Sequence, residues 1–324
     1  MAEYINIRGQ SIEVVASDPA NPTVGQIWYN STSNTLKGEG YAAGSWATGN
    51  PLNSGRRGLA GCGTQTAGLA FGGYPGSPPY SNATEEYNGT SWATSPGTLN
   101  TARAGLAGTG TQTAGLAIGG NSPITGATEE YNGSTWSPSN PLNTARDLLA
   151  TCGIQTAALA FGGRNTTPAV TGATESYDGN SWTTLAGSLN TARMSLAGAG
   201  TQTSALAFGG YDGTANTGVT EEYDGSSWTS VNSMNTVRTD LQGAGTQTAT
   251  VAFGGDLPGP SAATEEYDGT SWSTSPASMP TGKSGFGRAG TQASALTFGG
   301  SPGALTTTEE WTGSGPVTKT ITAS

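Results

Sequence analysis

The chain has 324 residues, of which 52 are glycine and only 10% are charged; its formal net charge is −10 and it contains no histidine. Glycine costs roughly 1 kcal/mol at a helical position, so this composition excludes a long-helix protein and suits short strands joined by tight turns. The acidic balance excludes a nucleic-acid partner, which would need a basic surface, and the lack of histidine removes the commonest general base and copper ligand. No stretch approaches the roughly 18 apolar residues of a membrane span, and the N-terminus shows no signal-peptide pattern.

Residues 1–30 differ in composition from the rest of the chain. Isoleucine and valine residues at alternating or adjacent positions precede the turn Asp18-Pro-Ala-Asn-Pro22, which predicts a hairpin. We predict that this segment is either a docking arm or a set of extra strands of the main domain, residues 31–324. The predicted docking residues are Ile5, Ile7, Ile12, Val14, Trp28 and Tyr29.

Six copies of a repeat of about 45 residues follow, and such a period marks a stacked or radial array. Each copy predicts four short strands. Two are rich in alanine and glycine, the third has the form Thr-Glu-Glu-Tyr, and the fourth begins near a tryptophan after an Asn-Gly or Asp-Gly turn. Small side chains inside and aromatic ones outside suit a wedge-shaped blade. The copies are marked by the pairs Gly72-Gly73, Gly119-Gly120, Gly162-Gly163, Gly209-Gly210, Gly254-Gly255 and Gly299-Gly300.

Incomplete copies at the two ends bear on the number of blades. Leu36–Tyr41 and Ser45-Trp46 repeat the third and fourth strands ahead of the first full copy, and Thr308–Trp311 is a third strand after the last Gly-Gly pair. We favour seven blades, one of them partial. In the six-bladed alternative the strand of Trp46 completes the last blade and the surplus strands form an arm. Either closure removes the exposed sheet edges.

The order of these features resembles the Kelch repeat. An Asn-Thr-Ala-Arg start, a Gly-Gly pair after the second strand, a Glu-Glu-Tyr third strand and a tryptophan in the fourth recur six times with small changes. The resemblance covers roughly residues 36–315 and implies an all-β fold, a Kelch-like β-propeller. The Gly-Thr-Gln-Thr turns also resemble the Kelch-like propellers of tailed-phage virion proteins. The stretch 25–37 resembles N-terminal segments of phage tail and appendage proteins.

The charged residues of the repeat are interpreted as structural contacts. They recur once per blade, whereas a catalytic site is unique and asymmetric, so we expect each Arg to bind a carboxylate or strand-end carbonyls. Cys62 and Cys152 share a repeat position with Thr and Ala, which predicts small buried residues. Asp212–Asn216 and Asp256 offer oxygen ligands, but no EF-hand spacing appears, so we predict no metal and no cofactor. The repeated cations are Arg56, Arg103, Arg146, Arg193, Arg238 and Lys283, and the glutamate pairs are Glu85-Glu86, Glu129-Glu130, Glu221-Glu222, Glu265-Glu266 and Glu309-Glu310.

The copies differ most in the loops after the Gly-Gly pairs and at the position after the repeat Arg. In an antiparallel blade these segments emerge on one face, so we predict a ligand-binding surface there, carried by a rigid frame. Solvent exposure without function would explain the variation equally well. The candidate binding residues are Tyr74, Tyr80, Arg164, Asn165, Tyr211 and Asp212 in the loops, and Arg57, Asp147 and Met194 after the Arg.

The resemblance implies a non-enzymatic structural or attachment protein of a phage virion, assembled in the host cytoplasm. Its N-terminal segment would dock to other virion proteins, and the loops would bind a host surface glycan, a host protein or a neighbouring subunit. Tail fibre and capsid decoration both stay open, as does a homo-oligomer. The alternative is a cellular Kelch scaffold that recruits protein partners, and a carbohydrate-active enzyme is less favoured. We expect neither nucleic acid nor membrane insertion.

Overall fold

The computed structural model describes residues 12–121, 123–166 and 169–321. In these ranges the regular structure consists of strands, which form seven four-stranded sheets and one two-stranded hairpin, and this confirms the predicted all-β class. None of these residues belongs to a helix that could cross a membrane. The chain divides into two compact units, Ser45–Thr312 and a smaller one made of Met1–Gly44 with Gly313–Ser324.

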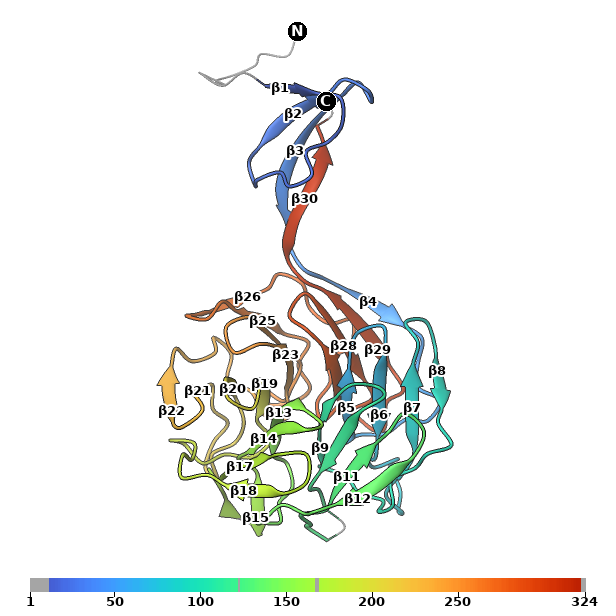
Figure 1. The fold of residues 1–324 in the computed structure, drawn as a ribbon, viewed down its shortest axis with the longest axis vertical. Helices are drawn as coiled ribbons and strands as arrows, with labels where there is room; N and C mark the ends of the chain where they lie inside the picture. Colours follow the sequence, from blue (N-terminus) through green and yellow to red (C-terminus); the bar gives the residue numbers. More distant parts are fainter. Residues whose placement is uncertain (1–11, 122, 167–168, 322–324) are drawn as a thin grey trace. The chain divides into compact units, whose positions relative to one another are not determined.

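The larger unit contains six of the four-stranded sheets described, which we call blades 1 to 6 (Figure 1). Blades 1 and 2 comprise β5 (Ala60–Gly63), β6 (Gly68–Phe71), β7 (Thr84–Tyr87) and β8 (Trp92–Thr94), then β9 (Ala107–Gly110), β10 (Gly115–Ile118), β11 (Thr128–Tyr131) and β12 (Trp136–Ser139). Blade 3 comprises β13 (Ala150–Ile154), β14 (Ala157–Phe161), β17 (Thr174–Tyr177) and β18 (Trp182–Thr184), with the hairpin β15 (Arg164–Thr166) and β16 (Ala169–Val170) inserted. Blades 4 and 5 comprise β19 (Ala197–Gly200), β20 (Ala205–Phe208), β21 (Thr220–Tyr223) and β22 (Trp228–Val231), then β23 (Gln242–Gly245), β24 (Thr250–Phe253), β25 (Thr264–Tyr267) and β26 (Trp272–Thr274). Blade 6 comprises β27 (Gly287–Gly290), β28 (Ser294–Phe298), β29 (Thr308–Thr312) and β4 (Ser45–Gly49).

The blades close into a ring. The first strands of successive blades contact one another in the order β5, β9, β13, β19, β23 and β27, and β27 contacts β5. One residue from each blade forms a closed circle of backbone hydrogen bonds, in which every N–H donates to the carbonyl oxygen of the preceding blade at 2.7–3.0 Å. We call this circle the inner ring; its members are Gly58, Gly105, Leu148, Ser195, Asp240 and Gly285.

The described part of the ring therefore has six blades, and it follows the alternative count rather than the seven that we favoured. β4 pairs with β29, with Trp46 opposite Trp311, so the start of this unit completes its last blade. The seventh four-stranded sheet belongs to the smaller unit. There β1 (Glu13–Val15) pairs in parallel with β2 (Ile27–Asn30), and β3 (Thr35–Ala42) pairs antiparallel with both β2 and β30 (Gly315–Thr320).

A cation and a glutamate are buried together inside each blade. In blade 3, Arg146 Nη2 donates to Glu175 Oε1 at 3.0 Å, and Arg146 Nη1 donates to the carbonyl oxygens of Gly162 and Ala173 at 3.2 and 2.6 Å. Both charged side chains are completely buried. The structural interpretation of the repeated charges is confirmed, because each cation contacts a carboxylate of its own blade. The other pairs are Arg56–Glu85, Arg103–Glu129, Arg193–Glu221, Arg238–Glu265 and Lys283–Glu309.

Tryptophans from the fourth strands join neighbouring blades. Trp182 Nε1 of blade 3 donates to Thr128 Oγ1 of blade 2 at 3.0 Å. Trp46 Nε1 makes the same contact with Thr264 Oγ1 of blade 5 at 2.9 Å. In the other blades this tryptophan belongs to the fourth strand of the same repeat. In blade 6 it comes from β4, at the start of the unit, so the ring closes without a seventh blade.

A candidate ligand-binding cavity at the centre of the ring

Each blade presents one pair of residues around the inner ring, and we call these the rim pairs. The residue after the repeat cation bridges to the residue after the Gly-Gly pair; in blade 1 the Arg57 N–H donates to the Tyr74 carbonyl at 3.0 Å and the Tyr74 N–H donates back at 2.7 Å. The backbone is the same in every blade, whereas the side chains differ. The rim pairs are Arg57/Tyr74, Ala104/Asn121, Asp147/Arg164, Met194/Tyr211, Thr239/Asp256 and Ser284/Ser301.

The inner ring has a glycine half and a side-chain half. All six members have φ between 52° and 62°, a left-handed conformation that glycine adopts most easily. Blades 6, 1 and 2 carry glycine, but blades 3, 4 and 5 hold Leu148, Ser195 and Asp240 at the same φ. A Cβ atom added to Gly58 or Gly285 would lie 3.4 or 3.7 Å from its nearest neighbour, an ordinary van der Waals distance. The packing therefore leaves room for a side chain at these positions, and three other blades accept one despite the strain of the left-handed conformation.

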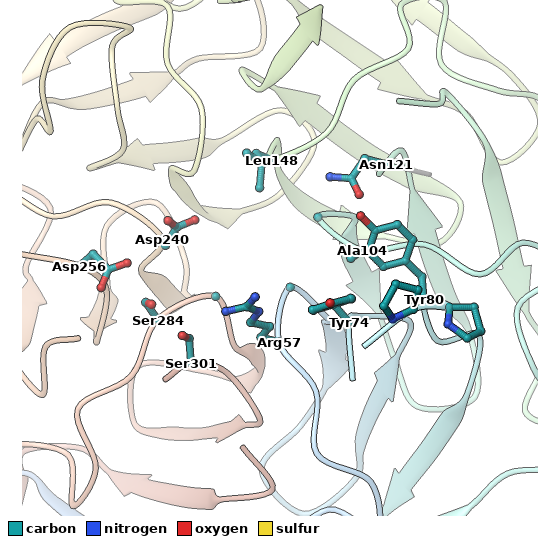
Figure 2. Close-up of a pocket in the computed structure, with 15 residues that line it drawn as sticks. Arg57, Tyr74, Tyr80, Ala104, Asn121, Leu148, Asp240, Asp256, Ser284 and Ser301 are labelled. Atoms are coloured by element: carbon teal, nitrogen blue, oxygen red, sulfur yellow. The ribbon is translucent and has the colours of Figure 1, made fainter. Parts of the chain in front are cut away.

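A cavity of about 790 Å³ lies over the glycine half (Figure 2). Its lining includes Gly58, Gly105 and Gly285, with Leu148 and Asp240 beside them. The volume falls within the range of small-molecule sites, roughly 300–1,000 Å³. These three glycines contribute no side chains to the lining.

Below the inner ring the central channel is narrow. The hollows nearest the ring measure about 70 and 40 Å³. Arg288 crosses the channel from β27, and its Nη2 donates to the carbonyl oxygens of Thr151 and Gly198, in blades 3 and 4, at 3.1 and 3.0 Å. The cavity is therefore open at the loop face and closed toward the channel.

Aromatic side chains form one wall of the cavity. The rings of Tyr74 and Tyr80 meet edge to face with their centroids 5.5 Å apart, and the Arg57 guanidinium lies over the Tyr74 ring at 5.3 Å. Figure 2 shows the two tyrosines on one side of the cavity, with Asn121 close to them. Such a wall offers both an apolar surface and hydroxyl groups.

Asp240 and Asp256 lie on the other side of the cavity, near Ser284 and Ser301, and Arg57 lies between the aspartates and the tyrosines (Figure 2). Burial raises the pKa of the Asp240 carboxyl; the charge of Asp256 adds to this rise, and a hydrogen bond from Ser195 opposes it. The cavity thus combines an acidic side, an aromatic side and one guanidinium.

Three of the nine predicted binding residues, Arg57, Tyr74 and Tyr80, line this cavity. The other six lie outside its lining. Arg164 donates through Nε and Nη2 to Asp147 at 3.0 and 2.6 Å, and Asn121 donates to the same carboxylate at 2.8 Å, so Asp147 holds two rim positions together. Asn165 lies in β15, next to Arg164. Tyr211 and Met194 form the rim pair of blade 4, and Asp212 accepts the N–H groups of Thr214 and Ala215.

The sequence analysis missed the inner ring and Arg288. A usable signal existed, since the position two residues after the repeat cation reads Gly, Gly, Leu, Ser, Asp, Gly in the six copies. Asp240 escaped notice because it is an isolated acidic residue in the sequence, and Asp256 was considered only as an oxygen ligand for a metal ion. Only the ring closure brings both to one cavity.

The predicted docking residues lie in the smaller unit, and Ile5 and Ile7 fall outside the described residues. Ile12 and Val14 are 37% and 66% exposed. Trp28 is completely buried within its own unit and donates from Nε1 to Asp18 Oδ1 at 3.0 Å, so its side chain is not available for docking. The Tyr29 hydroxyl donates to Asn34 Oδ1 at 3.2 Å.

Other reactive groups give no competing site in the described ranges. Cys62 and Cys152 are unpaired and buried as predicted, and burial raises the pKa of both thiols to about 12, which disfavours the nucleophilic thiolate at neutral pH. The described residues contain no group of three or more acidic or cysteine side chains placed to hold a metal ion.

No family model matches the chain, and a search of curated proteins finds no similar sequence.

Proposed function

We propose that this chain is a non-catalytic attachment protein, in which the ring binds a saccharide in the central cavity and the smaller unit joins the protein to a particle. One observation carries this proposal: three adjacent blades have glycine in the inner ring where the other blades have side chains at the same φ. Since the fold also accepts side chains at this position, we assign the open space over these glycines to a ligand.

The lining of the cavity fits a saccharide. Tyr74 and Tyr80 offer aromatic faces for the C–H groups of a sugar ring, and Asn121, Ser284 and Ser301 offer hydrogen-bonding groups for its hydroxyls. A largely apolar cavity with a few convergent polar groups is typical of small-molecule sites. A ligand of this class also agrees with the host surface glycan that we expected from the sequence.

The repeat pattern supports the Kelch-like family and, with it, a place in a phage virion, as a tail fibre or a capsid decoration. Exposed apolar residues support docking by the smaller unit. Six of the nine large hydrophobic residues exposed in the described part of the chain belong to it, and such exposure marks interaction surfaces. These six are Ile12, Val14, Val24, Ile27, Tyr41 and Ile321. A cellular Kelch scaffold stays the alternative if the partner of the cavity is a protein.

One observation favours a second candidate function, glycoside hydrolysis. The raised pKa of Asp240 is what a general acid needs, and Asp256 is a second carboxylate in the same cavity. Both aspartates come from blade 5 and lie on one side of the cavity (Figure 2), whereas hydrolysis needs carboxylates on either side of the scissile bond. We therefore favour binding. Release of reducing ends from an oligosaccharide by the purified chain, lost in Asp240→Asn, would establish the enzyme instead.

A matched pair of tyrosines tests the binding site. Tyr74 and Tyr211 occupy the same repeat position, but only Tyr74 lines the cavity. On a glycan array we expect a set of saccharides to bind the wild-type chain. Tyr74→Ala should lower their affinity about tenfold because it removes the stacking face, and Tyr211→Ala should leave it unchanged. Equal losses in the two variants, or an array without any bound saccharide, would contradict the proposal.

Immunogold labelling tests whether the protein is attached to a virion. In an infected culture of the source host we expect the label on the surface of virions. Label found only in the cell interior, away from any particle, would rule out the attachment role and leave the cellular scaffold.

A further inference from the structure

The charges of the cavity are not balanced by the protein. Its charged lining residues are Arg57, Asp240 and Asp256, and none of them forms an ion pair with any residue that the structure describes. The equivalent rim position of blade 3 differs, because there the buried Asp147 is paired with Arg164. Two carboxylates and one guanidinium leave the cavity with an excess of negative charge.

The fold does not require a carboxylate at position 240. The same inner-ring position carries Gly, Leu or Ser in the other blades, with almost the same φ. A partly buried carboxylate without a cation loses hydration, and a second carboxylate nearby adds repulsion. Burial and Asp256 both raise the pKa of Asp240, in line with this unfavourable environment. A positively charged group of a ligand would therefore stabilise the two aspartates of blade 5.

We infer that the cavity takes a saccharide with a free amino group, whose ammonium lies against Asp240 and Asp256 while its ring contacts Tyr74 and Tyr80. This inference rests on the proposed saccharide binding and adds its chemical class. An ammonium group offers donors to both carboxylates, and charge-assisted hydrogen bonds of this kind are roughly twice as strong as neutral ones. Arg57 then remains available for a hydroxyl or an anionic group of the same ligand.

A metal ion fits the cavity less well. Calcium takes six to eight oxygen ligands, whereas the acidic side offers two carboxylates and the hydroxyls of Ser284 and Ser301. Arg57 in the same cavity would repel a dication. A metal ion would also leave the aromatic wall without a role.

The test compares two oligosaccharides that differ only in the charge of their amino groups. Titration calorimetry would measure the binding of a glucosamine pentamer, with free amines, and of its fully N-acetylated counterpart. The wild-type chain should bind the free-amine oligomer at least tenfold more tightly. Asp240→Asn should remove most of this preference, because it weakens the binding of the free-amine oligomer. Asparagine tolerates the left-handed conformation, so this variant should fold.

Asp224→Asn is the matched control for net charge. Asp224 lies in an exposed turn between β21 and β22, and blades 1 and 2 carry Asn88 and Asn132 at the same position, so this variant removes one charge without disturbing the ring. It should keep the wild-type preference. An equal loss in both variants would mean that the preference reflects overall charge, which would overturn the inference.

The remaining outcomes separate the inference from the proposed function. Equal binding of the two oligomers, or tighter binding of the acetylated one, would overturn the amino-group inference and keep saccharide binding. Binding of neither oligomer would also overturn it, and the glycan array would then decide the proposed function on its own. A calorimetric signal for Ca²⁺ alone that disappears in Asp240→Asn would assign the aspartates to a cation and overturn the inference as well.

Discussion

The interior of each blade and the rim of the central cavity are formed by adjacent residues of the same repeat. The interior residues are nearly the same in all six blades, whereas the rim residues differ. Arg103 is buried against Glu129, as its counterparts are in the other blades, and the very next residue, Ala104, belongs to a rim pair that no other blade repeats. A residue that stabilises the fold is therefore followed directly by a residue that varies among the blades. Because backbone hydrogen bonds join the two residues of every rim pair, their side chains can change without loss of the fold.

The largest expected effect comes from breaking the interior. Arg193→Met leaves the carboxylate of Glu221 buried without its cation, which should lower the free energy of unfolding by about 3–5 kcal/mol. Arg57→Met changes a rim arginine that pairs with no described carboxylate, and it should cost less than about 1 kcal/mol. Urea denaturation of both variants measures the difference, and similar losses would contradict the separation of interior and rim.

Trp46→Ala tests whether β4, the strand that completes blade 6, is part of the stable interior. Trp46 packs against Phe253 and Trp311 with centroid distances of 5.4 and 5.3 Å, so its loss should cost about 3–5 kcal/mol, as should Trp182→Ala in a blade with a continuous chain. Thermal unfolding of the two variants compares them directly. A loss under about 1 kcal/mol for Trp46→Ala alone would mean that β4 does not close blade 6.

Blade 6 is the exception within the interior, because Lys283 replaces the arginine. Burial lowers the pKa of Lys283 from 10.5 to about 8. Between these two pH values the unfolded chain binds more protons than the folded chain, so stability should rise with pH across that window, by roughly 1–3 kcal/mol. Lys283→Arg should flatten this rise, since arginine keeps its charge there. Urea midpoints of the wild type and the variant at pH 7.5 and 10 would show it, and identical pH slopes would exclude the effect.

One substitution in the inner ring should have a modest effect on stability and a large effect on binding. Gly285→Leu places in blade 6 the residue that blade 3 carries at almost the same φ, so the free energy of unfolding should fall by about 1–2 kcal/mol, the cost of a non-glycine residue in the left-handed conformation. The new side chain occupies part of the cavity, and the saccharides selected on the array should lose most of their affinity. Calorimetry and thermal unfolding of the same sample measure both. Retained binding would place the site elsewhere.

The repeat made much of the fold predictable. Strand order, the buried Arg–Glu pairs and the buried cysteines all follow from a pattern read six times. The strand that pairs with Thr35–Ala42 could not be predicted in this way. The Gly-Tyr sequence near the end of Thr35–Ala42 is similar to that of a third strand, and only the structure shows that this segment pairs with β30. Local pattern identifies a strand, but the available edges decide where it pairs.

The candidate site was only partly predictable for a different reason. Tyr74, Tyr80 and Arg57 differ visibly between copies, and variation pointed to them. The inner-ring glycines contribute by lacking a side chain, in a sequence that contains 52 glycines, so they gave little signal. Arg288 stands where blades 1, 2, 4 and 5 carry glycine, and its reach across the channel to Thr151 depends on ring closure.

A crystal structure of the chain with the tightest saccharide from the array tests the central claim most directly. We predict the sugar over Gly58, Gly105 and Gly285, with one ring face against Tyr74. A saccharide bound at the outer edge of a blade, or on the smaller unit, would contradict it.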